Sequence, residues 1–178
     1  GEIPNAEGLS IEGAVVSGET GSNARATLIV EVAHGVLLSI SYRENNDPGE
    51  RYSGFEALNR LVNRAQLDLR FPNQPTATRE LKVLRRQERT LSGLRGQEFI
   101  TRTTLNNGQI YYAMQFLIKG GRGLLEPTVS IQFTTSDTPR ESDGLSYAVL
   151  PAEPVLIALW DAVLDSFKVR PGALPAGQ

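Results

Sequence analysis

The stretch near the end of the chain, residues 156–172, constrains the fold most, because its apolar side chains repeat at helical spacing. The apolar positions, at offsets 0, 3, 4, 7 and 11, are Leu156, Leu159, Trp160, Val163 and Phe167. Residues three, four and seven apart lie on one side of an α-helix. Pro154 suits the first turn of this helix, and Pro171 followed by Gly172 predicts that the helix ends before them. We therefore predict a helix that buries one stripe, with the only tryptophan of the chain, against a core.

Alternation of apolar and polar side chains predicts several strands before that helix. Within residues 36–43 the side chains that share one face are Val36, Leu38, Ile40 and Tyr42. Similar patterns predict strands over residues 9–16, 25–33, 36–43, 80–90, 97–105, 109–118 and 128–134. Asn107-Gly108 predicts a hairpin turn, since both residues tolerate positive φ, and His34-Gly35 predicts another.

A second helix is predicted after residue 53. Ser53 and Glu56 have the spacing of a capping box, in which each satisfies a backbone N–H of the first helical turn. The apolar stripe that follows is Phe55, Leu58, Leu61, Val62 and Ala65. Pro72 and Pro75 then mark a connector before the next strands.

The order of elements predicts the fold class. Hairpin-linked strands imply an antiparallel sheet, and one-sided alternation implies that helices cover one face. We predict an α+β fold, with an antiparallel sheet or sheets and helices packed on one face, in a single domain of residues 1–178. The repeated order also allows two similar lobes, residues 1–75 and 76–178, each with strands followed by a helix.

The composition offers few groups for chemistry. The chain has no cysteine and one histidine, His34, so it cannot assemble a metal site from those ligands. No serine stands in a G-x-S-x-G elbow. The acidic stretch 44–50 departs from the calcium-loop pattern, and the glycine-rich stretch 120–123 lacks the Gly-Lys-Ser/Thr ending of a phosphate loop. We predict no catalytic residue, metal or cofactor.

The charge is uneven along the chain. The formal net charge is −2, yet residues 79–102 carry seven basic and three acidic side chains, a balance of +4. Apart from Arg102, the basic residues of this strip are Arg79, Lys82, Arg85, Arg86, Arg89 and Arg95. The stretch from Arg79 to Arg95 lacks aromatic residues that could stack on bases, and no apolar run of the chain is long enough to span a bilayer. We therefore expect no nucleic-acid partner and no membrane insertion, and a function carried by a protein-binding surface.

Two stretches resemble a known family. Residues 92–98, Ser-Gly-Leu-Arg-Gly-Gln-Glu, fit a G-x-x-G-x-E pattern before a strand, and residues 158–172 fit a closing segment of the form LWD…S…RPG. Together they resemble the C-terminal domain of bacterial immunity proteins that neutralise lipase effectors of the type VI secretion system. The opening, residues 3–11, is similar to the start of that domain, with Ser10 where the family has a cysteine.

The resemblance implies a periplasmic protein that binds a cognate lipase or phospholipase effector and blocks it without performing chemistry. It also implies that a further domain precedes this one in full-length members. The residues of the family motif are Gly93, Gly96, Glu98, Trp160, Asp161 and Arg170. We expect the two glycines to form a turn or bulge, Glu98 to hydrogen-bond to that turn, Trp160 to be core and Arg170 to meet helix-end carbonyls.

The candidate contacts with such a partner lie in two loops and in the arginine-rich strand. They are Asn46, Asp47, Arg51, Arg85, Arg86, Arg89 and Arg122. On the last helix, only the polar side with Asp161 and Asp165 is expected to meet a partner. Two alternatives stay open: an envelope protein-interaction or accessory domain with no toxin partner, and a hydrolase with an unrecognised site.

Overall fold

The computed structural model describes residues 8–11, 14–17, 25–33, 35–45, 54–120, 123–135 and 150–168. Its strands are β1 (Gly8–Ile11), β2 (Ala14–Ser17), β3 (Arg25–Ala33), β4 (Val36–Asn45), β5 (Thr78–Leu91), β6 (Leu94–Leu105), β7 (Ile110–Ile118) and β8 (Gly123–Thr135). Its helices are α1 (Gly54–Asp68) and α2 (Glu153–Ser166). An α+β fold with antiparallel strands is thereby confirmed.

Six of the strands form one open antiparallel sheet in the order β3-β4-β8-β7-β6-β5. Strand β8, from the second half of the chain, pairs with β4, from the first half, so a single sheet runs across both halves. The predicted lobes therefore share one sheet. That residues 1–178 act as one domain of a longer protein stays a prediction.

The first predicted strand is two strands in the structure. β1 and β2 pair as a separate two-stranded antiparallel sheet, with Ile11 opposite Ala14. The sequence places Gly13 between them, and glycine favours a reversal of the chain over a continuous strand.

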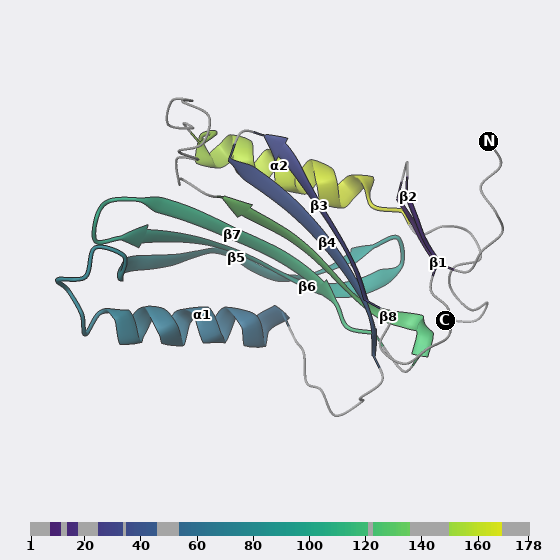
Figure 1. Cartoon of the computed structure of the whole chain (residues 1–178), viewed down its shortest axis with the longest axis horizontal. Coiled ribbons are helices and arrows are strands. Elements are labelled where there is room, and N and C mark those ends of the chain that lie inside the picture. The colour runs from purple at the N-terminus through teal and green to yellow at the C-terminus, as the bar shows by residue number, and fades with distance from the viewer. Residues whose placement is uncertain are drawn as a thin grey trace.

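The helices lie on opposite faces of the large sheet, which differs from the expected arrangement with both on one face (Figure 1). Neighbouring residues of β6 show this, because successive side chains of a strand point to opposite sides. Glu98 accepts a hydrogen bond from Trp160 of α2, whereas the side chain of Gln97 accepts one from the backbone N–H of Phe55 in α1. We call the two sides the α2 face and the α1 face.

The central strands are apolar on both sides, which explains why each face needs a cover. In β6 the adjacent residues Phe99 and Ile100 are both buried, and in β7 Phe116 and Leu117 are both buried. Strands covered on two faces read as continuous apolar runs instead of clean alternation. One helix could satisfy only one of these faces.

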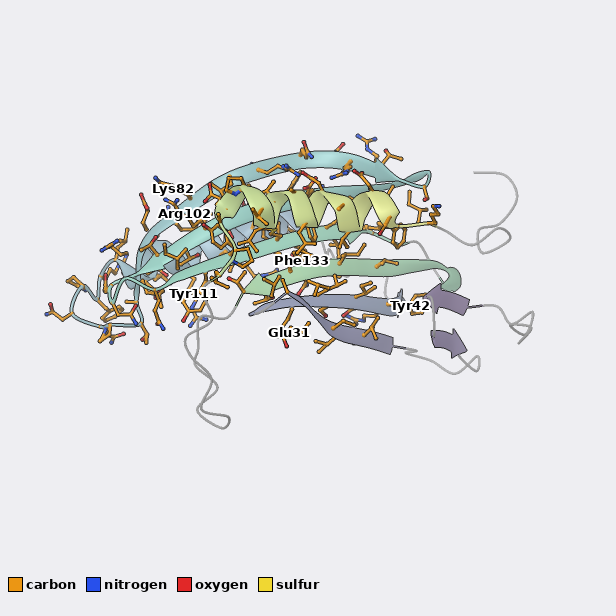
Figure 2. The ribbon with its side chains drawn as sticks, turned by 90° about the horizontal axis from the view of Figure 1, so that it is seen from above. Glu31, Tyr42, Lys82, Arg102, Tyr111 and Phe133 are labelled. Carbon is orange, nitrogen blue, oxygen red and sulfur yellow. The ribbon has the colours of Figure 1, made fainter. Side chains whose placement is uncertain are left out.

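The main core lies between the sheet and α2. Its largest fully buried side chains include Trp160, Phe116, Phe133, Ile100 and Met114. The rings of Trp160 and Phe133 meet edge to face, with centroids 5.2 Å apart, a favourable arrangement for two aromatic rings. Figure 2 shows Phe133 on the sheet beside the helix. The prediction that Trp160 is a core residue is confirmed.

Candidate partner-binding surface and the ion-pair network

Three arginines of β5, Arg85, Arg86 and Arg89, were expected to face a partner. The structure places Arg85 and Arg89 against α2. Arg85 donates two hydrogen bonds to the carboxylate of Asp161, at 2.6 and 3.0 Å. Arg89 donates to the same carboxylate at 3.0 Å and to Asp165 at 2.5 Å. The guanidinium groups of Arg85 and Arg89 thus link the edge strand to the helix.

A buried glutamate lies at the centre of this network. Glu98 is fully buried, and its carboxylate accepts hydrogen bonds from Trp160 Nε1 at 2.9 Å, Arg85 at 2.9 Å and Gln87 Nε2 at 2.7 Å. A buried carboxylate is tolerated only when it is paired and hydrogen-bonded, and here both oxygens are satisfied. The expectation that Glu98 bonds to the preceding turn was wrong. Its place on the α2 face aims it at the helix.

The charges in the network stabilise one another. The hydrogen bond to Asp161 raises the pKa of Arg85, and it outweighs burial, which acts in the opposite direction. Burial lowers the pKa of Arg89, but hydrogen bonds to Asp161 and Asp165 raise it to a net value above the ordinary one. The hydrogen bond from Arg85 holds the pKa of Asp161 below its usual range. These groups stay ionised at neutral pH and act as structural links.

The glycines of the family motif serve the same contact between sheet and helix. Ser92, at φ 49°, and Gly93, at φ 84°, form the two-residue turn between Leu91 and Leu94, and positive φ at both positions is typical of a type I′ hairpin. At Gly96 a Cβ atom would overlap the ring of Phe116. Gly93 is therefore required by backbone conformation and Gly96 by close packing.

The turn also meets the C-terminal end of α2. Ser92 Oγ donates a hydrogen bond of 2.9 Å to the carbonyl oxygen of Phe167, the residue that follows the helix. Helix ends leave carbonyl groups without intrahelical partners, and the hydroxyl satisfies one nearby. The predicted role of Arg170 at this end lies outside the described residues.

A second cluster holds the N-terminal end of α2. The carboxylate of Glu153 accepts hydrogen bonds from Tyr112 at 3.1 Å and from Arg102 at 3.4 Å. Arg102 also lies 3.6 Å from a carboxylate oxygen of Glu80. Burial, and then the hydrogen bond to Glu153, raise the pKa of Tyr112. In Figure 2, Arg102 lies near this end of the helix.

The remaining predicted contacts are distributed differently. Arg86 points to the α1 face, where its guanidinium lies 4.5 Å from the ring centroid of Phe55 in a cation–π contact. The predicted positions that fall outside the described residues are His34, Asn46, Asp47, Arg51, Ser53 and Arg122. The structure thus brings Arg85 and Arg89 together with the helix and leaves Arg86 apart from them.

Sequence reasoning missed the pairing between β5 and α2. The available signal was the match between two patterns. Two basic residues, at positions 85 and 89, lie four apart and therefore on one face of a strand, and two acidic residues, at 161 and 165, lie one helical turn apart. Each pattern alone is typical of a solvated surface. Only the docking of α2 across the strands joins them.

Within the described residues, no group of three or more His, Asp or Glu side chains is arranged to hold a metal ion. No helix in the described part of the chain is both long and apolar enough to cross a membrane. The charged clusters found on this fold connect the sheet to α2. The chain is therefore an α+β domain in which ion pairs, some of them partly buried, fix a helix to an open antiparallel sheet.

The comparison with protein families identifies the family. The family described as Tle cognate immunity protein 4 C-terminal domain matches residues 2–172, and the chain belongs to this family. This confirms the resemblance drawn from residues 92–98 and 158–172. No curated protein matches the chain.

Solved structures share the fold. The structure titled the Tle4-Tli4 complex matches with a TM-score of 0.68 and 21% identity, covering 96% of this chain and 53% of that one. The immunity protein TplEi of T6SS from Pseudomonas aeruginosa matches in its apo form with a TM-score of 0.60 and 21% identity, covering 96% of this chain and 52% of that one. The same protein complexed with an "L" peptide matches with a TM-score of 0.65 and 21% identity, covering 96% and 56%. This chain spans about half the length of these proteins.

Proposed function

We propose that this chain is the part of an immunity protein that binds a phospholipase effector of the type VI secretion system and inhibits it, protecting the bacterium that makes both. The observation that carries the proposal is the family match across residues 2–172. A Tle4-Tli4 complex and the immunity protein TplEi share the fold, which agrees with it. The cognate effector is the partner, and the periplasm is the compartment in which the two meet.

In this proposal the domain acts by binding and performs no reaction. The polar cluster around Glu98 supports this role because its donors and acceptors are already bound to one another. Trp160, Arg85 and Gln87 all donate to the same carboxylate. Such a network holds α2 in place, and it offers a partner a rigid surface whose shape is set before binding.

The test uses the protein as its gene encodes it and the lipase encoded beside that gene. The two are mixed at equal concentration, complex formation is followed by size-exclusion chromatography, and hydrolysis of phospholipid vesicles is followed over time. We expect one complex peak and loss of hydrolysis at a one-to-one ratio. Full hydrolysis in the presence of a tenfold excess would contradict the proposal and favour the accessory-domain alternative.

A further inference from the structure

The turn that follows α1 displays large apolar side chains to solvent. Leu67 is 53% exposed, Leu69 is 60% exposed and Phe71 is 53% exposed, all within five consecutive residues. We call these three residues the apolar turn. Single exposed apolar residues are ordinary on a protein surface, whereas contiguous exposed apolar patches are typical of interaction sites.

The backbone that carries the apolar turn is held in place by hydrogen bonds. The N–H of Leu69 donates to the carbonyl of Ala65 at 3.2 Å, that of Arg70 to Leu67 at 3.0 Å, and that of Phe71 to Asp68 at 2.8 Å. Helical geometry thus continues past the end of α1. The three apolar side chains have fixed positions and lose little backbone entropy on binding.

The connector behind the apolar turn is fixed from two further sides. Asp68 accepts hydrogen bonds from the N–H of Thr78 at 3.2 Å and from its hydroxyl at 2.8 Å. The side chain of Asn106, in the β6–β7 hairpin, donates to the carbonyls of Pro72 at 3.1 Å and Gln74 at 2.8 Å. These bonds hold the connector through polar contacts, so the exposed apolar side chains are not needed to hold it.

Most of the charged side chains near the apolar turn are positive. Arg64, Arg70 and Arg79 are exposed, and none of them has an ion pair with a residue in the described part of the chain. Arg64 lies one helical turn before Leu67, Arg70 lies within the apolar turn, and Arg79 follows Thr78. The neighbouring carboxylate of Asp68 is bound to Thr78. Arg85 and Arg89 differ from these three arginines, because both form ion pairs with Asp161.

We propose that the apolar turn and Arg64, Arg70 and Arg79 form a docking surface for an apolar depression with a carboxylate rim on the effector. This inference rests on the proposed function, which supplies a protein partner. Apolar anchors surrounded by charged groups that find opposite charges are typical of binding hot spots. The planar guanidinium of arginine suits the bidentate geometry of carboxylates.

Two other occupants fit the surface less well. In a symmetric pair of this chain the same patch would meet itself, placing arginines against arginines. A lipid surface is bound firmly by a broad apolar face or by two anchors, and three side chains in one turn supply a smaller apolar area. A protein with opposite charge matches both the size and the sign of the surface.

The first variant removes the apolar anchors. Leu67→Ser, Leu69→Ser and Phe71→Ser are combined in the full-length protein, and affinity for the effector encoded beside its gene is measured by titration calorimetry. Because these side chains are exposed, the variant folds with an unchanged thermal midpoint. The loss of three anchors is expected to weaken affinity by about a hundredfold or more. The matched control is Ile29→Ser with Val155→Ser, two exposed apolar residues elsewhere, which leaves affinity unchanged.

The second variant reverses the charge of the rim. Arg70→Glu with Arg79→Glu is expected to lower the association rate constant about tenfold at low salt and to reduce its dependence on salt. The control is Lys119→Glu with Lys168→Glu, two exposed lysines elsewhere in the described chain, measured under the same conditions. The control changes the net charge by the same amount as the rim variant. An effect of the rim arginines themselves can therefore be distinguished from an effect of net charge.

The outcomes distinguish this inference from the proposed function. If the unaltered protein binds and inhibits the effector, and both surface variants do so equally well, the docking surface is wrong and the proposed function stands. If the unaltered protein does not bind at all, both are wrong. Vesicles of phosphatidylglycerol provide the last arm: binding to them that the serine variant abolishes, with effector binding intact, assigns the surface to lipid and overturns the inference.

Discussion

The two helices are attached to the same sheet in different ways. Helix α2 places Leu156, Trp160 and Leu164 on the sheet with no exposed surface, and ion pairs surround them. Helix α1 buries smaller surfaces, with Leu58 at 3% and Ala65 at 8% exposed, and it ends in the apolar turn. The α2 face is therefore a closed structural core, whereas the α1 side keeps apolar and basic groups available. The contrast leaves exposed apolar and basic groups at the end of α1, whereas the buried side of α2 is enclosed by its core and ion pairs.

The largest expected difference between the two helices comes from truncating their central buried residues. Trp160→Ala leaves a cavity beside Phe133 and removes a donor to the buried carboxylate of Glu98, so we expect a loss of about 4 kcal/mol in the free energy of unfolding. Leu58→Ala on α1 should cost about 2–3 kcal/mol. Urea unfolding followed by circular dichroism measures both. Equal losses would show that the two faces contribute alike.

Packing density gives a second comparison, with one glycine on each side. Gly96→Ala drives a Cβ into the ring of Phe116 and to 2.8 Å from the carbonyl oxygen of Leu117, and it should cost about 2–3 kcal/mol. Gly54→Ala at the start of α1 meets Gln97 O at 3.1 Å. The gain in helix propensity offsets part of that strain, so the change should stay below about 1 kcal/mol. Thermal denaturation of both variants tests the order.

The buried carboxylate is the next place to test the α2 face. Glu98→Gln keeps the shape of the side chain but turns an NH2 group towards one of the donors, Trp160, Arg85 or Gln87. We expect a loss of about 2 kcal/mol in unfolding free energy, because at least one buried donor is left unsatisfied. The matched control is Glu88→Gln, a surface partner of Arg95, which should change stability by less than about 0.5 kcal/mol. A neutral result for Glu98→Gln would mean that the network is not a source of stability.

The lowered pKa of Asp161 predicts that the stability of the α2 face depends on pH. A carboxyl group whose pKa is lower in the folded state than in the unfolded state adds stability above the unfolded value, about 3.9, and this stability is lost as the pH falls through the folded value. Between pH 7 and pH 5 the contribution is constant. Asp161→Asn should cost about 1 kcal/mol at pH 7, since solvent partly screens the pair, and the cost should shrink as the pH falls below the unfolded value. Urea midpoints across this range measure it, and a cost independent of pH would contradict the assignment.

The smallest effect is expected on the α1 face. Arg86→Ala removes the cation–π contact with Phe55, which is worth about 0.5–1 kcal/mol at an exposed site. Arg86→Lys should retain part of it. Because neither change touches the α2 network, the pH dependence of unfolding should match that of the unaltered protein. A larger effect than that of Asp161→Asn would reverse the comparison between the faces.

The hairpins and helices could be predicted from the sequence because local chemistry decides them. Gly108, and Ser92 with Gly93, adopt positive φ in two hairpin turns, and the stripe around Trp160 determines the buried side of α2. The face of the sheet that each helix covers could not be predicted from one-sided alternation. An apolar stripe indicates which side of a helix is buried, but it does not indicate which face of the sheet that helix covers. The adjacent apolar residues Phe99 and Ile100 point to opposite faces of the sheet, and this pattern indicates that both faces are covered.

The candidate site was harder to predict because the same residue types serve internal and external contacts. Arg85 and Arg89 have the charge and spacing of a binding strip, and in the fold they meet Asp161 and Asp165. No pattern in the sequence separates the apolar residues of the turn after α1 from ordinary residues near the end of a helix. Their exposure is a property of the packed fold, since Asp68 and Asn106 hold the connector through polar contacts and leave these side chains outside.

The single tryptophan also gives this protein a built-in optical reporter. Its indole is enclosed between Phe133 and the carboxylate of Glu98, so its fluorescence emission depends on whether α2 remains seated on the sheet. Separation of the helix would expose the ring to water and shift the emission to longer wavelengths. Docking of a partner at the far turn leaves that environment intact. One unlabelled signal therefore distinguishes a domain that has bound its partner from one that has begun to open.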